Sequence, residues 1–180
     1  MNLPNRLTLL RIALIPLCIL LIVLGWQLAA GIVFILASLT DFLDGYIARR
    51  DNLVTNFGKF ADPVADKILS LAVMVTLIPY AGFPWWAAAI VAARELAVDG
   101  LRLVAVEQGI VIAAGKLGKI KTNFQFFSVL SALFHLPDAV TLTLCVIMAI
   151  LTVISGAQYF LASGQLFKQD LKIKKTDSED

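Results

Sequence analysis

Six long apolar stretches follow one another along the chain, and short polar or glycine-containing breaks separate them. They occupy residues 7–24, 29–48, 58–79, 85–107, 118–135 and 139–162. Each stretch is close to the ~20 residues that an α-helix needs to cross the hydrocarbon core of a membrane. The pattern predicts an all-α polytopic membrane protein with six transmembrane helices and an N-terminal amphipathic segment.

The composition supports a surface that faces lipid. Of the 180 residues, 59% are hydrophobic and 16% are charged, whereas soluble domains carry about 25% charged residues. The net charge of +2 is too small to indicate binding to nucleic acid. We assign residues 1–167 to a single membrane-embedded domain and residues 168–180 to a charged tail. No signal cleavage site is evident, so we expect the first stretch to remain in the mature protein.

Basic residues indicate how the chain is oriented in the membrane. With six crossings, the loops on one side contain or adjoin twelve of the fifteen basic residues, and the opposite loops carry only Asp138. By the positive-inside rule, both termini and the basic loops are expected to be cytoplasmic. Cys18 and Cys145 lie in apolar stretches and are expected to be buried thiols. His135, beside Pro137, is expected to have a structural role in a turn.

Two acidic pairs lie at the cytoplasmic ends of the second and third stretches. The purely apolar residues 29–40 span only about 18 Å as a helix, which is too short for a ~30 Å hydrocarbon core. The second helix must therefore continue through Asp41 and Asp44, and the third carries Asp62 and Asp66. An antiparallel pairing of the two helices places Asp41 opposite Asp66, and Asp44 opposite Asp62.

Four carboxylates at this depth need a counter-charge, because like charges in a low dielectric cannot all stay ionised. Oxygen ligands without Cys or His favour Mg²⁺ or Mn²⁺ over zinc, and two such ions suit phosphoryl transfer. A cation transporter also places carboxylates inside the membrane. It would need polar groups along a path to both faces, whereas the outer half of every stretch is almost wholly apolar.

Other residues near the acidic pairs suggest how substrates bind. Gly45 and Gly58 allow the close approach of either a helix or a ligand, and Arg49 suits either phosphate binding or control of topology. Basic residues at a similar level predict a site for a phosphorylated acceptor; they are Arg94, Arg102, Lys119 and Lys121. The alternative is that Arg102 pairs with Asp99 and that the lysines only set the topology.

The acidic motif resembles the signature of the CDP-alcohol phosphotransferase family at every defining position. It reads Asp41-x-x-Asp44-Gly45-x-x-Ala48-Arg49, then eight residues, then Gly58-x-x-x-Asp62-x-x-x-Asp66. The segment Pro4-Asn5-x-x-Thr8-x-x-Arg11 is similar to that of bacterial members. Arg94-Glu95, Gly100-Leu101-Arg102 and Leu117-Gly118-Lys119-Ile120-Lys121-Thr122 resemble members that use glycerol 3-phosphate as the acceptor.

The resemblance implies an enzyme of phospholipid biosynthesis in the bacterial cytoplasmic membrane, acting as a homodimer. It would transfer the phosphatidyl group of CDP-diacylglycerol to glycerol 3-phosphate and release CMP. Two Mg²⁺ or Mn²⁺ ions would be held by Asp41, Asp44, Asp62 and Asp66, with Asp66 also the catalytic base. Related enzymes whose acceptor is inositol phosphate or phosphatidylglycerol are the nearest alternative.

The resemblance also implies two groups of substrate-binding residues. CDP-diacylglycerol would be bound by Asn5, Thr8, Arg11, Gly45, Ala48, Arg49 and Gly58. The phosphate of the acceptor would be bound by Arg94, Arg102, Lys119 and Lys121.

Overall fold

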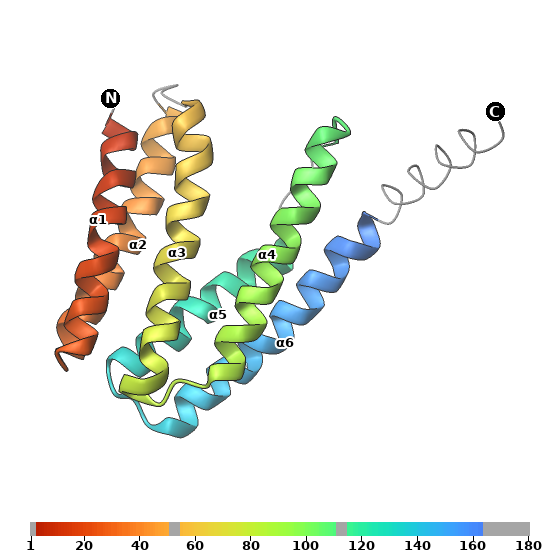
Figure 1. The fold of residues 1–180 in the computed structure, drawn as a ribbon. Helices are drawn as coiled ribbons and strands as arrows, with labels where there is room; N and C mark the ends of the chain where they lie inside the picture. Colours follow the sequence, from red (N-terminus) through yellow and green to blue (C-terminus); the bar gives the residue numbers. More distant parts are fainter. Residues whose placement is uncertain (1–2, 51–54, 111–114, 164–180) are drawn as a thin grey trace, which may run out of the picture.

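The computed structural model describes residues 3–50, 55–110 and 115–163, and every regular element in these ranges is an α-helix. The helices are α1 (Leu3–Val23), α2 (Gln27–Arg50), α3 (Asn56–Ala81), α4 (Trp85–Glu107), α5 (Lys116–Leu133) and α6 (Asp138–Ala162) (Figure 1). The all-α class and the order of six helical stretches are thereby confirmed. The predicted charged tail, residues 168–180, lies outside the described residues.

The N-terminal segment, which we expect to be amphipathic, is the first part of the continuous helix α1. Asn5, Thr8 and Arg11 recur every three residues, so they lie along one face of the helix. All three are buried, because this face contacts the neighbouring helices. The polar residues of α1 therefore serve contacts within the protein.

Helix α1 packs along both α2 and α3, whereas α2 and α3 contact each other over a much shorter length. The predicted pairing of α2 with α3 is thus largely a contact among three helices, with α1 as the third. Small buried residues, among them Ala30 and Ala37 of α2 and Ala65 of α3, let the helices approach closely. Larger side chains such as Ile22 and Phe34 fill the core between them.

The remaining helices form a second group, in which α6 packs against both α4 and α5. Figure 1 shows α4 and α6 leaning away from α1–α3 toward the end where α1 begins. Helices α3 and α5 also contact each other, as do α3 and α4. The two groups are therefore in contact, and α3 and α5 join them.

The opposite end of the molecule is closed by turns that contact each other. Gly82 ends α3 with a φ of 63°, and its N–H donates to the carbonyl of Leu77. The Gln27 amide, at the start of α2, donates to the carbonyl of Tyr80 at 2.8 Å. The α1–α2 turn is thereby attached to the α3–α4 turn. His135 lies exposed in the α5–α6 turn with a φ of 51°.

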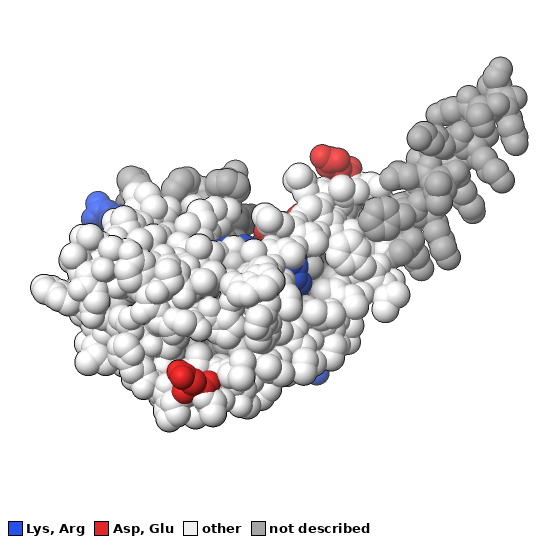
Figure 2. All heavy atoms as spheres, turned by 60° about the horizontal axis from the view of Figure 1, so that its bottom comes forward, with Lys and Arg blue, Asp and Glu red and all other residues white. Residues whose placement is uncertain are grey.

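Among the residues that the structure describes, three helices contain segments long and apolar enough to cross a membrane by length and composition: Asn5–Val23, Ala61–Ala81 and Asp138–Ala162. The apolar part of α2, Gln27–Asp41, is shorter, so six crossings stay a prediction. The face shown in Figure 2 is dominated by uncharged residues, with only isolated charged ones. These properties are those of a membrane protein. Cys18 and Cys145 are free and buried, as predicted.

Candidate active site

Polar residues of α1 hold two of the predicted metal-binding aspartates. The fully buried Arg11 side chain donates from Nη1 to Oδ1 of Asp41 on α2 at 2.7 Å. The buried Thr8 hydroxyl donates to Oδ1 of Asp62 on α3 at 2.5 Å. Because Thr8 and Arg11 lie one turn apart on the same face, α1 orients one carboxylate from each neighbouring helix.

Asn5 extends this polar row to the start of α3. Thr55, the N-cap of α3, donates its hydroxyl to Oδ1 of Asn5 at 2.9 Å and accepts the N–H of Gly58 at 3.0 Å. A Cβ atom at Gly58 would lie 3.4 Å from Asn5 Oδ1 and 3.5 Å from Asp62 Oδ2. Gly58 thus lies in contact with side chains of this protein, and its predicted role in binding CDP-diacylglycerol stays a prediction.

The aspartates concentrate negative charge beside these contacts. The carboxylate of Asp41 repels those of Asp62 and Asp66, and the Arg11 guanidinium offsets part of this repulsion. A site of this kind, built from carboxylate oxygens, fits a hard divalent cation such as Mg²⁺ or Mn²⁺.

The complete set of four aspartates stays a prediction. Asp44, Gly45, Ala48 and Arg49 lie in the part of α2 whose side chains the structure does not describe. Among the described residues, no group of three or more His, Cys, Asp or Glu side chains is arranged to hold a metal ion.

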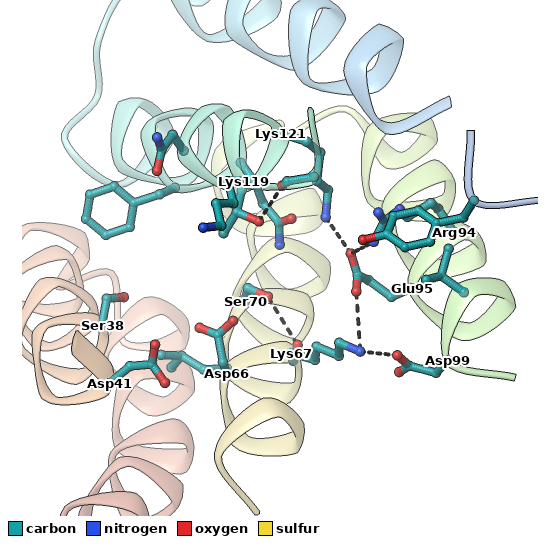
Figure 3. Close-up of a pocket in the computed structure, with 18 of the residues that line it drawn as sticks. Ser38, Asp41, Asp66, Lys67, Ser70, Arg94, Glu95, Asp99, Lys119 and Lys121 are labelled. Atoms are coloured by element: carbon teal, nitrogen blue, oxygen red, sulfur yellow. Dashed lines mark hydrogen bonds and ion pairs between the residues drawn. The ribbon is translucent and has the colours of Figure 1, made fainter. Parts of the chain in front are cut away.

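A pocket of about 360 Å³ lies beside Asp41 and Asp66 and is lined by residues of α2 to α6. Figure 3 shows the two aspartates at one side of this pocket and the basic residues of α4 and α5 across from them. The lining includes all four residues predicted to bind the acceptor phosphate, namely Arg94, Arg102, Lys119 and Lys121. The structure therefore brings the predicted base and the predicted phosphate-binding residues into one cavity.

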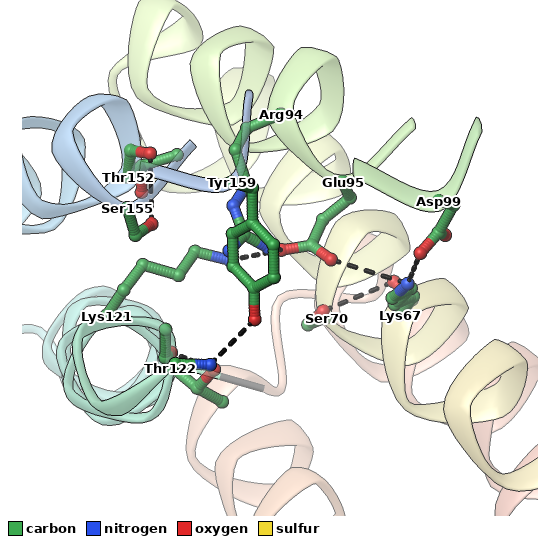
Figure 4. Close-up of polar contacts among 12 residues, drawn as sticks. Lys67, Ser70, Arg94, Glu95, Asp99, Lys121, Thr122, Thr152, Ser155 and Tyr159 are labelled. Carbon is green, nitrogen blue, oxygen red and sulfur yellow. Dashed lines mark hydrogen bonds and ion pairs between the residues drawn. The ribbon is translucent and has the colours of Figure 1, made fainter. Parts of the chain in front are cut away.

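Glu95 connects basic residues from three helices inside this pocket. Its Oε1 accepts from Nζ of Lys121 at 2.6 Å and from Nη1 of Arg94 at 3.1 Å. Its Oε2 lies 3.5 Å from Nζ of Lys67 on α3 (Figure 4). The Lys121 side chain is only 3% exposed, so this lysine does more than set the topology.

Arg102 does not pair with Asp99. Asp99 forms an ion pair with Lys67 instead, and Arg102 donates from Nη2 to the Tyr159 hydroxyl of α6 at 3.1 Å. Arg102 and Asp99 are three residues apart on α4, a spacing that would allow them to pair. Both instead bind residues of other helices. Lys119 lies exposed at the pocket.

Lys67 and Tyr159 line the pocket although neither was among the predicted site residues. Lys67 has a sequence signal, because a charged residue inside an apolar stretch usually has a function. Tyr159 has no comparable signal, because tyrosine is also common where a helix leaves the membrane. Only the packing of α6 against α4 and α5 reveals its place.

The chain matches a family model described as CDP-alcohol phosphatidyltransferase over residues 1–161. It is 44% identical over 188 residues to a Bacillus subtilis protein named CDP-diacylglycerol–glycerol-3-phosphate 3-phosphatidyltransferase, covering 93% of this chain and 97% of that protein. A Rickettsia typhi protein of the same name is 41% identical over 177 residues, covering 92% of this chain and 99% of that protein. The match includes every helix that lines the pocket, and the chain therefore belongs to the CDP-alcohol phosphatidyltransferase family.

Proposed function

We propose that this protein transfers the phosphatidyl group of CDP-diacylglycerol to glycerol 3-phosphate, giving phosphatidylglycerol phosphate and CMP. The main structural support is the pocket that joins Asp41 and Asp66 to a cluster of basic residues. The names of the Bacillus and Rickettsia relatives specify the same two substrates. The proposed reaction contributes to phospholipid biosynthesis.

Asp41, Asp44, Asp62 and Asp66 are the proposed ligands of two divalent cations, Mg²⁺ or Mn²⁺. When bound, such ions neutralise charge on the diphosphate of CDP-diacylglycerol and polarise the phosphorus that is attacked. Thr8 and Arg11 orient Asp62 and Asp41 through the contacts described above. We therefore propose a second role for these two α1 residues: in addition to binding CDP-diacylglycerol, they orient the carboxylates.

Asp66 is the proposed base. Its carboxylate would take the proton from the acceptor hydroxyl as the hydroxyl oxygen forms a bond to the lipid-side phosphorus and CMP leaves. The support is its place in the pocket together with Arg94, Arg102, Lys119 and Lys121. These cations suit a phosphate dianion, and they would hold the acceptor with its hydroxyl toward Asp66.

Glycerol 3-phosphate is water-soluble, so the pocket should open toward the cytoplasm. We propose six crossings of the bacterial cytoplasmic membrane, with both termini on the cytoplasmic side. The basic residues at that end support this orientation through the positive-inside rule. The homodimer is likewise a proposal, which rests on the family resemblance.

A direct experiment is to incubate purified protein with CDP-diacylglycerol and one acceptor at a time, with and without Mg²⁺ or Mn²⁺. We expect CMP release with glycerol 3-phosphate and its loss on addition of EDTA. Release with inositol phosphate or phosphatidylglycerol, but not with glycerol 3-phosphate, would contradict the acceptor assignment. No release with any acceptor would contradict the proposed enzymatic function.

A further inference from the structure

Tyr159 is the only residue of α6 that lines the pocket within the described part of the chain. Its side chain is buried, with the residue 7% exposed. It enters the junction of α4, α5 and α6, as Figure 4 shows. A tyrosine that faces lipid would present its ring to the membrane, whereas this one is buried with Val98, Leu101 and Ala105 of α4.

The two guanidinium groups of the pocket both lie against the Tyr159 ring. The Cζ atoms of Arg94 and Arg102 are each 5.3 Å from the ring centroid. The electron-rich face of an aromatic ring attracts a cation at this distance. The ring thereby holds two groups of like charge that would otherwise repel each other.

The Tyr159 hydroxyl fixes one of these groups and the start of α5. It accepts from Nη2 of Arg102 at 3.1 Å and from the backbone N–H of Gly115, the N-cap of α5, at 2.8 Å. Helix α5 carries Lys119 and Lys121. One oxygen atom thus links an arginine of α4 to the helix that supplies both pocket lysines.

Glycines near Tyr159 lie against the Arg94 side chain. Gly156 lies one turn earlier on the same face of α6, and a Cβ there would lie 3.2 Å from Cγ of Arg94, closer than an ordinary contact. A Cβ at Gly118 of α5 would lie 3.6 Å from Nη2 of Arg94. The Arg94 side chain therefore lies against α5 and α6, and the lack of a side chain at Gly156 leaves space for it.

Both arginines keep an unused hydrogen-bond donor. The Nε atoms of Arg94 and Arg102 are buried and have no hydrogen-bond partner among the described residues. A buried donor without a partner is costly. Both arginines also line the pocket, so an anion in the pocket would meet two guanidinium groups.

We propose that Tyr159 is a positioning residue, which sets the spacing of Arg94 and Arg102 so that both bind the phosphate of the acceptor. This inference rests on the proposed function, because it assumes that a phosphate monoester enters the pocket. Tyr159 acts through the arginines and through α5. It is not assigned a contact with the reacting atoms.

The test compares Tyr159→Phe, which keeps the ring, with Tyr159→Leu, which removes it. We expect Tyr159→Phe to raise the KM for glycerol 3-phosphate about tenfold, because the hydroxyl's hydrogen bond from the charged Arg102 is lost together with the one from Gly115. Tyr159→Leu should raise it further, because the contacts of both guanidinium groups with the ring are also lost. The KM for CDP-diacylglycerol and kcat should change much less in both variants. Phe160→Leu is the matched control, because Phe160 is the next residue and is 43% exposed.

A double-mutant cycle with Arg102→Ala distinguishes positioning from general damage to the fold. If Tyr159 acts through Arg102, Tyr159→Phe should add much less to the KM in the Arg102→Ala background than in the wild type. Full additivity, an unchanged KM for glycerol 3-phosphate, or an equal rise for both substrates would overturn the inference. The wild-type reaction is a separate test: if it shows no transfer to glycerol 3-phosphate, the proposed function itself fails.

Discussion

Asp66, the proposed base, lies across the pocket from the basic residues of α4 and α5. Asp66→Asn keeps the size of the side chain but removes its capacity to accept a proton. We expect turnover to fall roughly 100-fold or more, with the melting temperature in detergent nearly unchanged. CMP release measures the first effect. Asp138→Asn, at the exposed first residue of α6, is the control, and near-normal turnover of Asp66→Asn would refute the proposed role.

Glu95 neutralises the buried charge of Lys121 and also contacts Arg94. Glu95→Gln leaves the Lys121 ammonium, whose side chain is 3% exposed, without its counter-charge. We expect a loss of about 3 kcal/mol in the free energy of unfolding, because a buried charge without a partner is strongly destabilising. Thermal or denaturant unfolding in detergent measures this loss. Glu107→Gln, at the exposed end of α4, should be neutral.

The same ion pair provides a second test. In the double variant Glu95→Gln/Lys121→Met the unpaired ammonium is removed, so part of the lost stability should return. A double variant that is less stable by the sum of both single losses would show that the pair is not coupled.

At the scale of single residues, some contacts could be predicted from the sequence and others could not. The proximity of Asp41 to Asp66 follows from helix rise and antiparallel direction alone, and the structure places both in one pocket. The alternative that Arg102 pairs with Asp99, three residues earlier, is not what the structure shows. Lys67 and Tyr159, from other helices, are the actual partners, and a contact between helices leaves no local pattern in the sequence.

At the scale of the helices, the order of the six elements was predictable, because apolar length alone separates them. The ends of the helices were less predictable. Helix α2 runs to Arg50 and α3 begins at Asn56, whereas the apolar stretches end at residue 48 and begin again at residue 58. The role of α1 was also missed. Asn5, Thr8 and Arg11 of α1 are buried against α2 and α3. This burial arises only where the three helices meet, so the sequence of α1 alone does not predict it.

The turn after α3 offers a test at this scale. Gly82 has a φ of 63°, which an L-residue with a side chain adopts only at a cost of about 1–2 kcal/mol. We expect Gly82→Ala to lower the free energy of unfolding by about this amount. Gly100→Ala is the control, because Gly100 lies within α4 with open space around it and alanine favours a helix. Equal effects of the two substitutions would contradict the conformation of this turn.

At the scale of the whole molecule, the orientation in the membrane can be tested with thiol labelling. Cys18 and Cys145 are buried, so a cysteine introduced at Lys116 or Asp138, both exposed, should dominate the signal. We expect an impermeant reagent to label Asp138→Cys in intact cells and Lys116→Cys only after permeabilisation. Labelling of both variants in intact cells would contradict a crossing by α5, and the reverse pattern would contradict the proposed orientation.

In the proposed function, the residues of this pocket join a phosphatidyl group to glycerol 3-phosphate. The most direct measurement follows radiolabelled glycerol 3-phosphate into the lipid phase during incubation with purified protein, CDP-diacylglycerol and Mg²⁺ or Mn²⁺. We expect a labelled lipid that migrates as phosphatidylglycerol phosphate, formed together with an equal amount of CMP. Label that stays in the aqueous phase while wild-type protein, metal and both substrates are present would refute the proposed function.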